Sequence, residues 1–233
     1  MFSVLILGLL LGLQHAVESD HLAAVASLGA HGGRLRDAAR LGAAWGVGHS
    51  LTLLLFGGAA ILIGGGIGPR LALGLESLVG LMLMLLGSDV LLRLWRKRVH
   101  FHAHNHGRRT HFHAHSHTPG QDHADGAHRH SHSSGLPLRP LLVGMVHGMA
   151  GSAALIVLAL GSVQSVWQGL AYLVLFGIGS AVGMAALAVV ISLPLRWSAR
   201  SLTWAHNGLT AMLGVFTITL GALLLQQSTQ GLL

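Results

Sequence analysis

The seven residues His15-Ala16-Val17-Glu18-Ser19-Asp20-His21 place two imidazoles and two carboxylates inside a stretch that otherwise has the composition of a transmembrane helix. A charged side chain at the centre of a bilayer costs about 2.5–3.5 kcal/mol on insertion scales, so several in one span require a compensating role. Imidazole and carboxylate together are ligands for divalent transition metals such as nickel, cobalt, zinc or manganese. The stretch therefore predicts a metal site inside the membrane.

The composition of the whole chain is that of an integral membrane protein, because 52% of its residues are hydrophobic and only 9% are charged. A helix needs about 20 residues to cross the hydrocarbon core of a bilayer. Six apolar stretches are long enough: Phe2–Ala24, Leu41–Ile63, Leu71–Trp95, Leu138–Leu160, Gln168–Leu193 and Leu202–Gln226. We therefore predict an all-α polytopic membrane protein with six transmembrane helices.

Basic residues are concentrated in the odd-numbered loops, which lie in the cytoplasm according to the positive-inside rule. They follow the first, third and fifth spans as Arg34, Arg36, Arg40, Arg93, Arg96, Lys97, Arg98, Arg108, Arg109, Arg129, Arg139, Arg196 and Arg200. Only Arg70 falls in an even-numbered loop. We expect a multi-pass protein of the cell (inner) membrane with both termini outside. The net charge of +7 is thus a topology signal and does not imply a nucleic-acid partner.

Several classes of function are excluded by what the sequence lacks. The absence of cysteine excludes disulfides, thiolate metal sites and thiol–disulfide relays. Nothing resembles a nucleotide-binding loop, so transport would draw on the membrane potential, a proton gradient or a separate partner. The H-E-x-x-H spacing of a zinc hydrolase helix is also absent. We expect neither an enzyme nor a protein with a resident cofactor.

The second half of the chain repeats features of the first. The aligned segments are Leu11-Gly12-Leu13-Gln14-His15 with Val143-Gly144-Met145-Val146-His147, Trp45-Gly46-Val47-Gly48 with Phe176-Gly177-Ile178-Gly179, and Gly80 and Gly87 with Gly214 and Gly221. A three-helix unit that occurs twice in one chain is inserted upside down the second time, and inverted repeats are typical of secondary transporters. We therefore predict two inverted three-helix halves, residues 1–99 and 136–233, joined by a loop of residues 100–135.

Helical geometry places most of the polar cluster on one side of the first span. Each residue of a helix turns by about 100°, so His15, Glu18 and His21 are expected within an arc of about 120°. Asp20 lies on the flank beside His21, where a carboxylate can orient an imidazole without binding the ion itself. Such a face can offer two or three ligands to one ion.

Other spans can add donors to this site. His49 lies inside the second span and His147 inside the fourth, each beside a glycine that lets a neighbouring helix approach. His147 can equally be satisfied by a hydrogen bond between helices. Glu76, Asp89 and His206 are further polar residues at or near membrane depth, and for these an ion pair or an interfacial position competes with metal binding.

The spacing His15-(four residues)-Asp20-His21 resembles the H-x4-D-H signature of the nickel/cobalt transporter family, and Gly48-His49-Ser50 looks like that family's second histidine motif. The resemblance covers the first span and half of the second closely, and the rest in layout only. It implies that His15, Asp20, His21 and His49 recognise the metal. Glu18 falls where related sequences often carry an acidic residue.

The fourth span departs from the longest members of that family, which have eight spans and acidic motifs in their later helices. Here it carries His147-Gly148-Met149-Ala150-Gly151-Ser152. The chain is more similar to a short six-span branch that includes urease-accessory-type permeases and nickel/cobalt efflux proteins. That likeness implies a cytoplasmic metallochaperone, or an assembly factor of urease or hydrogenase, as a partner.

Between the third and fourth spans lies a tract, residues 100–132, that holds twelve of the eighteen histidines. We expect it to be disordered, because it is too polar to pack, and to act as a cytoplasmic chelator that concentrates or buffers metal. Its candidate ligands are His100, His102, His104, His106, His111, His113, His115, His117, His128, His130 and His132. A solvated linker with incidental metal affinity is the alternative.

The sequence thus favours a secondary transporter for Ni²⁺ or Co²⁺ with its ligands at His15, Glu18, Asp20, His21, His49 and His147. Uptake is slightly favoured over efflux, although efflux-type relatives carry a similar histidine-rich loop. A zinc exporter, an intramembrane metalloenzyme and an accessory membrane protein that binds metal without moving it are the competing readings.

Overall fold

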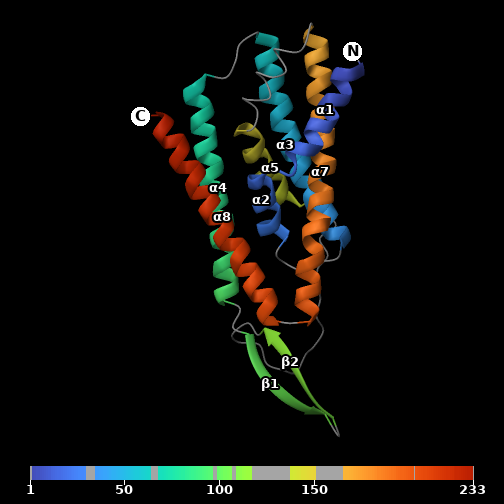
Figure 1. The fold of residues 1–233 in the computed structure, drawn as a ribbon, viewed down its shortest axis with the longest axis vertical. Helices are drawn as coiled ribbons and strands as arrows, with labels where there is room; N and C mark the ends of the chain where they lie inside the picture. The colour runs from blue at the N-terminus through green and yellow to red at the C-terminus, as the bar shows by residue number, and fades with distance from the viewer. Residues whose placement is uncertain are drawn as a thin grey trace.

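The computed structural model describes residues 2–29, 35–63, 68–96, 99–106, 109–116, 137–150, 165–201 and 203–232. Over these residues the chain forms seven helices and one two-stranded hairpin (Figure 1). The helices are α1 (Phe2–His15), α2 (Ser19–Gly29), α3 (Leu35–Ile63), α4 (Pro69–Arg96), α5 (Leu138–Ala150), α7 (Val166–Ser201) and α8 (Thr203–Leu232).

Four of these helices, α3, α4, α7 and α8, are long and apolar enough to cross a membrane. They correspond to the second, third, fifth and sixth predicted spans, so the helical, polytopic class predicted from the sequence is confirmed. The predicted fourth span, Leu138–Leu160, begins as α5, and its part beyond Ala150 lies outside the described residues.

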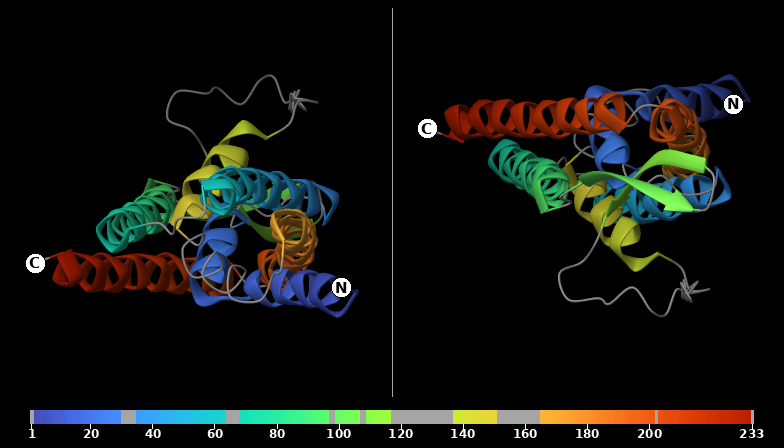
Figure 2. Two further views of the ribbon diagram at one scale, coloured as in Figure 1. Left: turned by 90° about the horizontal axis from the view of Figure 1, so that it is seen from above. Right: turned by 90° about the horizontal axis from the view of Figure 1, so that it is seen from below.

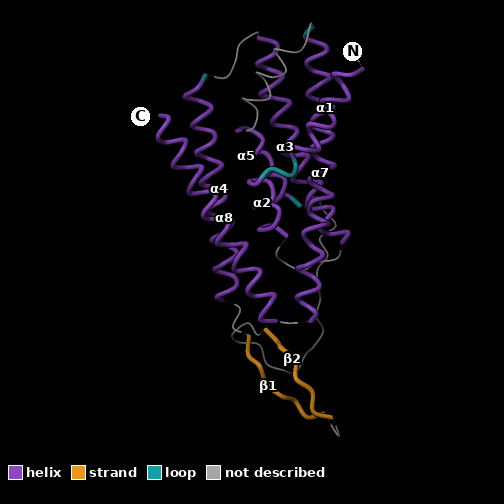
Figure 3. Tube along the Cα trace, viewed as in Figure 1, coloured by secondary structure: helices purple, strands orange, loops and turns teal. Residues whose placement is uncertain are grey.

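The prediction of one continuous helix over Phe2–Ala24 is wrong, because the chain leaves helical geometry at Ala16–Glu18 and starts again at Ser19. Figure 3 shows this break at mid-height of the helical bundle, between α1 and α2. The amide N–H groups of Val17 and Glu18 donate to carbonyls only three residues back, those of Gln14 and His15. Serine and aspartate favour helix starts, which explains why α2 begins at Ser19-Asp20.

Seen from either end of the bundle, α4 and α8 pair on one side, while α1, α3 and α7 group on the other (Figure 2). The shorter α2 and α5 lie between these two groups. α2 is almost entirely buried from His21 to Leu28. Its core neighbours include Trp45 of α3, Leu83 of α4 and Met184 of α7.

Close helix crossings position α1 and α5 against the long helices. A Cβ atom at Gly12 of α1 would collide with the carbonyl oxygen of Phe176 in α7. In the same way, a Cβ atom at Gly144 of α5 would collide with the carbonyl oxygen of Trp45 in α3. Only glycine permits backbones to approach this closely, and small residues at helix interfaces are characteristic of membrane bundles.

Within the histidine-rich segment predicted to be disordered, the structure instead describes two antiparallel strands, β1 (Val99–His106) and β2 (Arg109–Ser116), beyond one end of the bundle (Figure 1). Their register pairs His100 with His115, His102 with His113 and His104 with His111. The alternation of histidine with other residues has the period of a strand. Residues 107–108 and 117–135 of the predicted loop lie outside the described residues.

Candidate metal centre

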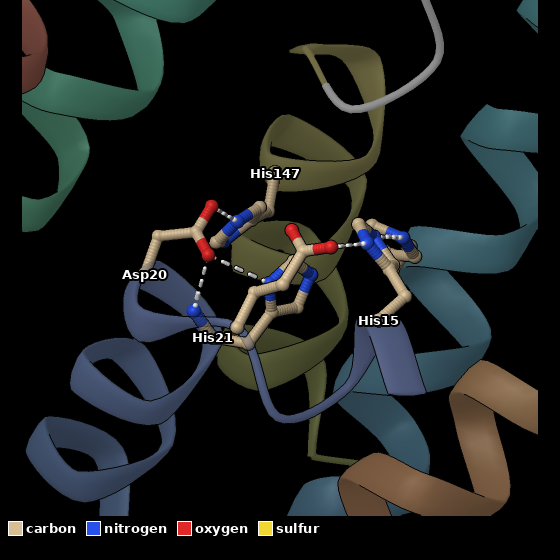
Figure 4. A network of polar contacts seen from close by, with 6 residues as sticks. His15, Asp20, His21 and His147 are labelled. Atoms are coloured by element: carbon tan, nitrogen blue, oxygen red, sulfur yellow. Dashed lines mark hydrogen bonds and ion pairs between the residues drawn. The ribbon is translucent and has the colours of Figure 1, made fainter. Parts of the chain in front are cut away.

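Four histidines from four helices meet where α1 ends and α2 begins (Figure 4). The ring centroid of His21 lies 4.4 Å from that of His15, 4.2 Å from that of His147 and 5.2 Å from that of His49. We call these four residues the histidine cluster. All four are buried, with exposed fractions of 7% for His15, 1% for His21, 0% for His49 and 2% for His147.

The break in the first span brings His15 and His21 together. His15 is the last residue of α1, and His21 lies in the first turn of α2. The three residues between the helices include Glu18, whose carbonyl oxygen accepts the first hydrogen bond of α2 from the N–H of Leu22. The predicted single helical face is therefore replaced by the end of one helix facing the start of another.

Two carboxylates fix the ring orientation of these two histidines. His15 Nδ1 lies 2.9 Å from Glu18 Oε1, and His21 Nδ1 lies 2.9 Å from Asp20 Oδ1. Because an ionised carboxylate only accepts hydrogen bonds, each Nδ1 must donate its proton. The lone pair of each neutral ring is then on Nε2, where a metal ion could bind, as in the carboxylate–histidine arrangement common at metal sites.

His15, His21 and His49 each offer one ring nitrogen close enough to the others to share an ion. His15 Nε2 lies 3.3 Å from His49 Nε2, and His21 Nε2 has no hydrogen-bond partner among the described residues. The ligand atoms of these histidines lie within 4.8 Å of one another. Two nitrogens that bind one tetrahedral ion at about 2.0–2.1 Å are about 3.3–3.4 Å apart, which matches the separation between His15 and His49.

Asp20 connects this group to the second half of the chain. Its Oδ2 atom accepts a hydrogen bond from Nε2 of His147 at 2.9 Å, while its Oδ1 atom also accepts the backbone N–H of His21 at 2.9 Å. Asp20, His21 and His147 form a second group in which one ligand atom from each lies within 4.8 Å of the others. The hydrogen bond leaves the lone pair of a neutral His147 on Nδ1, which is buried and has no partner among the described residues.

Aromatic rings close two sides of the cluster. Trp45 of α3 lies 5.4 Å from the His21 ring and 5.6 Å from the His147 ring, measured between centroids. Phe176 of α7 lies 5.3 Å from the His15 ring. These rings limit the access of water from two sides, and a lower local dielectric constant strengthens the bond between an ion and its ligands.

A cavity of about 150 Å³ adjoins the cluster on the side of α4 and α8. Its lining is mostly polar where it meets α2 and α5 and includes carboxylates as well as imidazoles. The lining residues are His15, Glu18, Asp20, His21, Glu76, Val79, His147 and Leu224. The side chain of Glu18 is 56% exposed, so the cluster borders open space at this point.

The structure brings together all six residues singled out from the sequence as an intramembrane site: His15, Glu18, Asp20, His21, His49 and His147. The role of each as a metal ligand stays a prediction. Of the eleven candidate ligands in the tract of residues 100–132, seven lie on β1 and β2, whereas His117, His128, His130 and His132 lie outside the described residues.

The remaining polar residues have separate positions. Asp89 accepts hydrogen bonds from Arg93 and Arg139, so it forms the ion pair that was one of the alternatives predicted for it. His206 is near Ser198 at the junction of α7 and α8. The sequence analysis did not predict that Trp45 and Phe176 lie beside the site. Their equivalent positions in the two halves, each followed by a glycine, could have indicated this.

Comparison with known proteins adds one relative over nearly the whole chain. The sequence is 34% identical over 222 residues, 95% of this chain and 90% of the other, to the urease accessory protein UreH of Bacillus sp. (strain TB-90). No family model matches the chain. No solved structure matches it either.

Proposed function

Since this chain belongs to the family of the urease accessory protein UreH, a family of non-enzymatic transporters or accessory proteins, we propose that it is a secondary transporter of Ni²⁺, Co²⁺ or both. The ion crosses the membrane through the histidine cluster and is the substrate of the protein. The resemblance to the nickel/cobalt transporter family, carried by the spacing His15-x4-Asp20-His21, and to its short branch of urease-accessory-type permeases is confirmed by this relationship.

One observation carries the proposal: buried imidazoles from four helices converge at a break in the first span, and carboxylates orient two of them. Discontinuous helices at mid-membrane depth are typical of secondary transporters, where freed backbone groups and helix ends contribute to substrate sites. Nitrogen donors suit nickel and cobalt, and Glu18 and Asp20 supply the negative charge that a divalent ion needs inside a bilayer.

The transport cycle rests on two inverted repeats, each contributing three of six spans. The proposed symmetry is supported by matched helix crossings, because Gly12 of α1 faces Phe176 of α7 just as Gly144 of α5 faces Trp45 of α3. It is supported further by α4 and α8, where Gly80 contacts Gly221 and Gly87 contacts Gly214. Rocking of one repeat against the other would expose the histidine cluster to each side of the membrane in turn.

We place both termini outside the cell and the histidine-rich segment in the cytoplasm, following the distribution of arginine and lysine. In this orientation the favoured direction is uptake, and the segment collects ions as they arrive. A cytoplasmic metallochaperone or an assembly factor for urease or hydrogenase would then remove them. Tethered weak sites raise the local concentration without changing the translocation step.

The test is accumulation of radioactive nickel, at trace external concentration, in cells that express the wild type or His21→Ala. We expect accumulation above that of empty-vector cells, and its loss in the variant, because His21 contacts every other member of the cluster. Accumulation below the empty vector, restored in the variant, would assign efflux. Equal accumulation in all three, for nickel and for cobalt, would contradict transport.

A second candidate follows from the relative, which is named an accessory protein. In this alternative the chain binds the metal in the membrane and presents it to an assembly factor without moving it across. Reconstituted proteoliposomes separate the two functions, because a non-transporting protein binds nickel but does not deliver it to a chelating dye inside the vesicles.

A further inference from the structure

We propose that the cavity beside the histidine cluster is the path by which a hydrated divalent cation reaches the site, and that Glu76 of α4 draws the ion into it. The inference deepens the proposed function and rests on it in one respect, the identity of the cluster as the site of the transported ion. The cavity and Glu76 are features of the described residues in their own right.

The cavity is lined both by residues of the cluster and by residues of α4 and α8. Glu76 and Val79 are in the first half of α4, and Leu224 is in the second half of α8. These parts of the two helices are on the side of the termini, away from the hairpin (Figure 1). Glu76 is seven residues after the start of α4, about 10 Å along its axis. A volume of about 150 Å³ holds several water molecules, as a partly hydrated ion requires.

Glu76 is an exposed side chain with no hydrogen-bond or ion-pair partner in the part of the chain that the structure describes. The other carboxylates in the cavity differ from it, because Glu18 is bonded to His15 and Asp20 to two histidines. An unpaired carboxylate within an apolar helix is costly unless it serves a polar path. No lysine or arginine lines the described cavity, so the field inside it favours cations.

The inner end of the path is formed by an imidazole of the histidine cluster. His21 also lines the cavity, is 1% exposed, and has an Nε2 atom with no partner among the described residues. An ion that passes Glu76 and then Glu18 would therefore meet a free imidazole nitrogen. The carboxylates bind the ion while it keeps most of its water, and the nitrogens replace that water in the buried cluster.

On the other side of the cluster, a salt-bridge network links α4 to α5. Near the other end of α4, Asp89 accepts hydrogen bonds from Arg93 of the same helix and from Arg139 in the first turn of α5. In the proposed repeat, the position equivalent to Glu76 is Thr210 of α8, which is only 7% exposed. An exposed Glu76 and a buried Thr210 are what a transporter open on the side of its termini would present.

The absence of native cysteine permits a direct test with single cysteines in the full chain, reconstituted in lipid nanodiscs. We expect a cationic, water-soluble methanethiosulfonate to label Glu76→Cys and Leu224→Cys at least tenfold faster than Leu81→Cys. Leu81 is also on α4 and is exposed, but it does not line the cavity and would face lipid. Equal labelling rates at positions 76 and 81 would overturn the proposed path.

The role of Glu76 is tested by the rate of Ni²⁺ association, followed by quenching of tryptophan fluorescence because Trp45 lies 5.4 Å from His21. We expect Glu76→Gln to slow association about tenfold at low ionic strength, since focused charge raises encounter rates by about 10–1000-fold, and salt to shrink the difference. Glu76→Asp, which keeps the charge, should associate at nearly the wild-type rate. An unchanged rate in Glu76→Gln would overturn the role of Glu76.

These outcomes are distinguishable from a failure of the proposed function. If the wild type binds nickel but carries no flux into proteoliposomes, transport is excluded while the path to the cluster still stands. If labelling and association show no effect of position 76 while flux persists, the ion enters by another route and the transport function stands.

Discussion

Two regions of this chain are rich in histidine, and they differ in how their imidazoles are brought together. The histidine cluster has four imidazoles, all buried, drawn from α1, α2, α3 and α5. The tract of residues 100–132 has twelve, close together in sequence and interrupted by few apolar side chains. In the cluster, the fold brings together histidines that are far apart in sequence. In the tract, the histidines are already close together in sequence.

For selective metal binding, the number of imidazoles is less important than which ring nitrogen of each carries the proton. In the cluster, Glu18 and Asp20 fix which nitrogen of His15 and His21 carries the proton. A tract of repeated histidines has many equivalent ways to bind an ion, which suits it to buffering rather than to selection. Tight binding and transport should therefore depend on the cluster, and metal capacity should depend on the tract.

The largest expected effect is that of His21→Ala on tight nickel binding by the purified protein. His21 is within 5.2 Å of the other three rings of the cluster and has a free Nε2. Removal of one group that only orients a metal ligand lowers metal affinity about 10–100-fold. We therefore expect removal of a direct ligand to lower the affinity by more than about a hundredfold. Equilibrium dialysis with ⁶³Ni measures it, and unchanged tight affinity would refute the assignment of the cluster.

The next effect is that of Asp20→Asn, which tests whether carboxylate control separates the two regions. An asparagine oxygen can still accept from one histidine, but its amide group donates and so cannot accept from the second. We expect His147 or His21 to lose its fixed orientation, with a fall in affinity of about 10–100-fold. Cobalt absorption spectra of the bound protein should shift at the same time.

Glu18→Gln is the matched comparison for Asp20→Asn. Glu18 orients one histidine and is 56% exposed, whereas Asp20 bridges two, with 25% exposure. We therefore expect Glu18→Gln to lower the nickel affinity less than Asp20→Asn does. An equal or larger loss of nickel affinity in Glu18→Gln would show that the bridge of Asp20 between His21 and His147 is no more important for binding than the single contact of Glu18.

Much of the site was predictable, because each of its residues is a polar group in an apolar span, which is visible without a structure. The meeting of His147 with Asp20 was not predictable, since it depends on how α5 is rotated against the start of α2. No local pattern encodes that rotation. It is set by contacts such as the crossing of Gly144 with Trp45, which join residues far apart in sequence.

The break at Ala16–Glu18 was missed for a different reason. A long apolar stretch predicts a continuous helix. The preference of Ser19 and Asp20 for the start of a helix is a weaker signal than the hydropathy of the residues around them. The hairpin of Val99–Ser116 was missed because composition and periodicity gave conflicting indications. Period-two alternation favours strands, but the tract has too few apolar residues to suggest packing.

A moderate effect is expected for Gly148→Ala, which tests whether the cluster depends on close helix packing. A Cβ atom there would collide with the carbonyl oxygen of His49 and the hydroxyl of Thr52, and it lies next to His147. Overpacking of this kind costs about 1–3 kcal/mol, so we expect a lower melting temperature and weaker nickel binding. Gly208→Ala in α8 is the control, since a Cβ atom there meets nothing within 4 Å. Equal melting temperatures for the two variants would contradict the tight α3–α5 crossing.

The smallest effect on tight binding is expected when the paired strand histidines, His100, His102, His104, His111, His113 and His115, are all replaced by asparagine. Asparagine preserves polarity and removes the imidazoles, so the number of weakly bound ions should fall while the affinity of the cluster changes less than about twofold. Equilibrium dialysis across a wide range of nickel concentrations separates the two classes of site in one experiment. Uptake should decline only when external nickel is scarce, because a tethered buffer alters local concentration and leaves the translocation step untouched. A loss of uptake at saturating nickel would mean that the tract hands ions to the cluster directly, and the division of roles between the two regions would then be wrong.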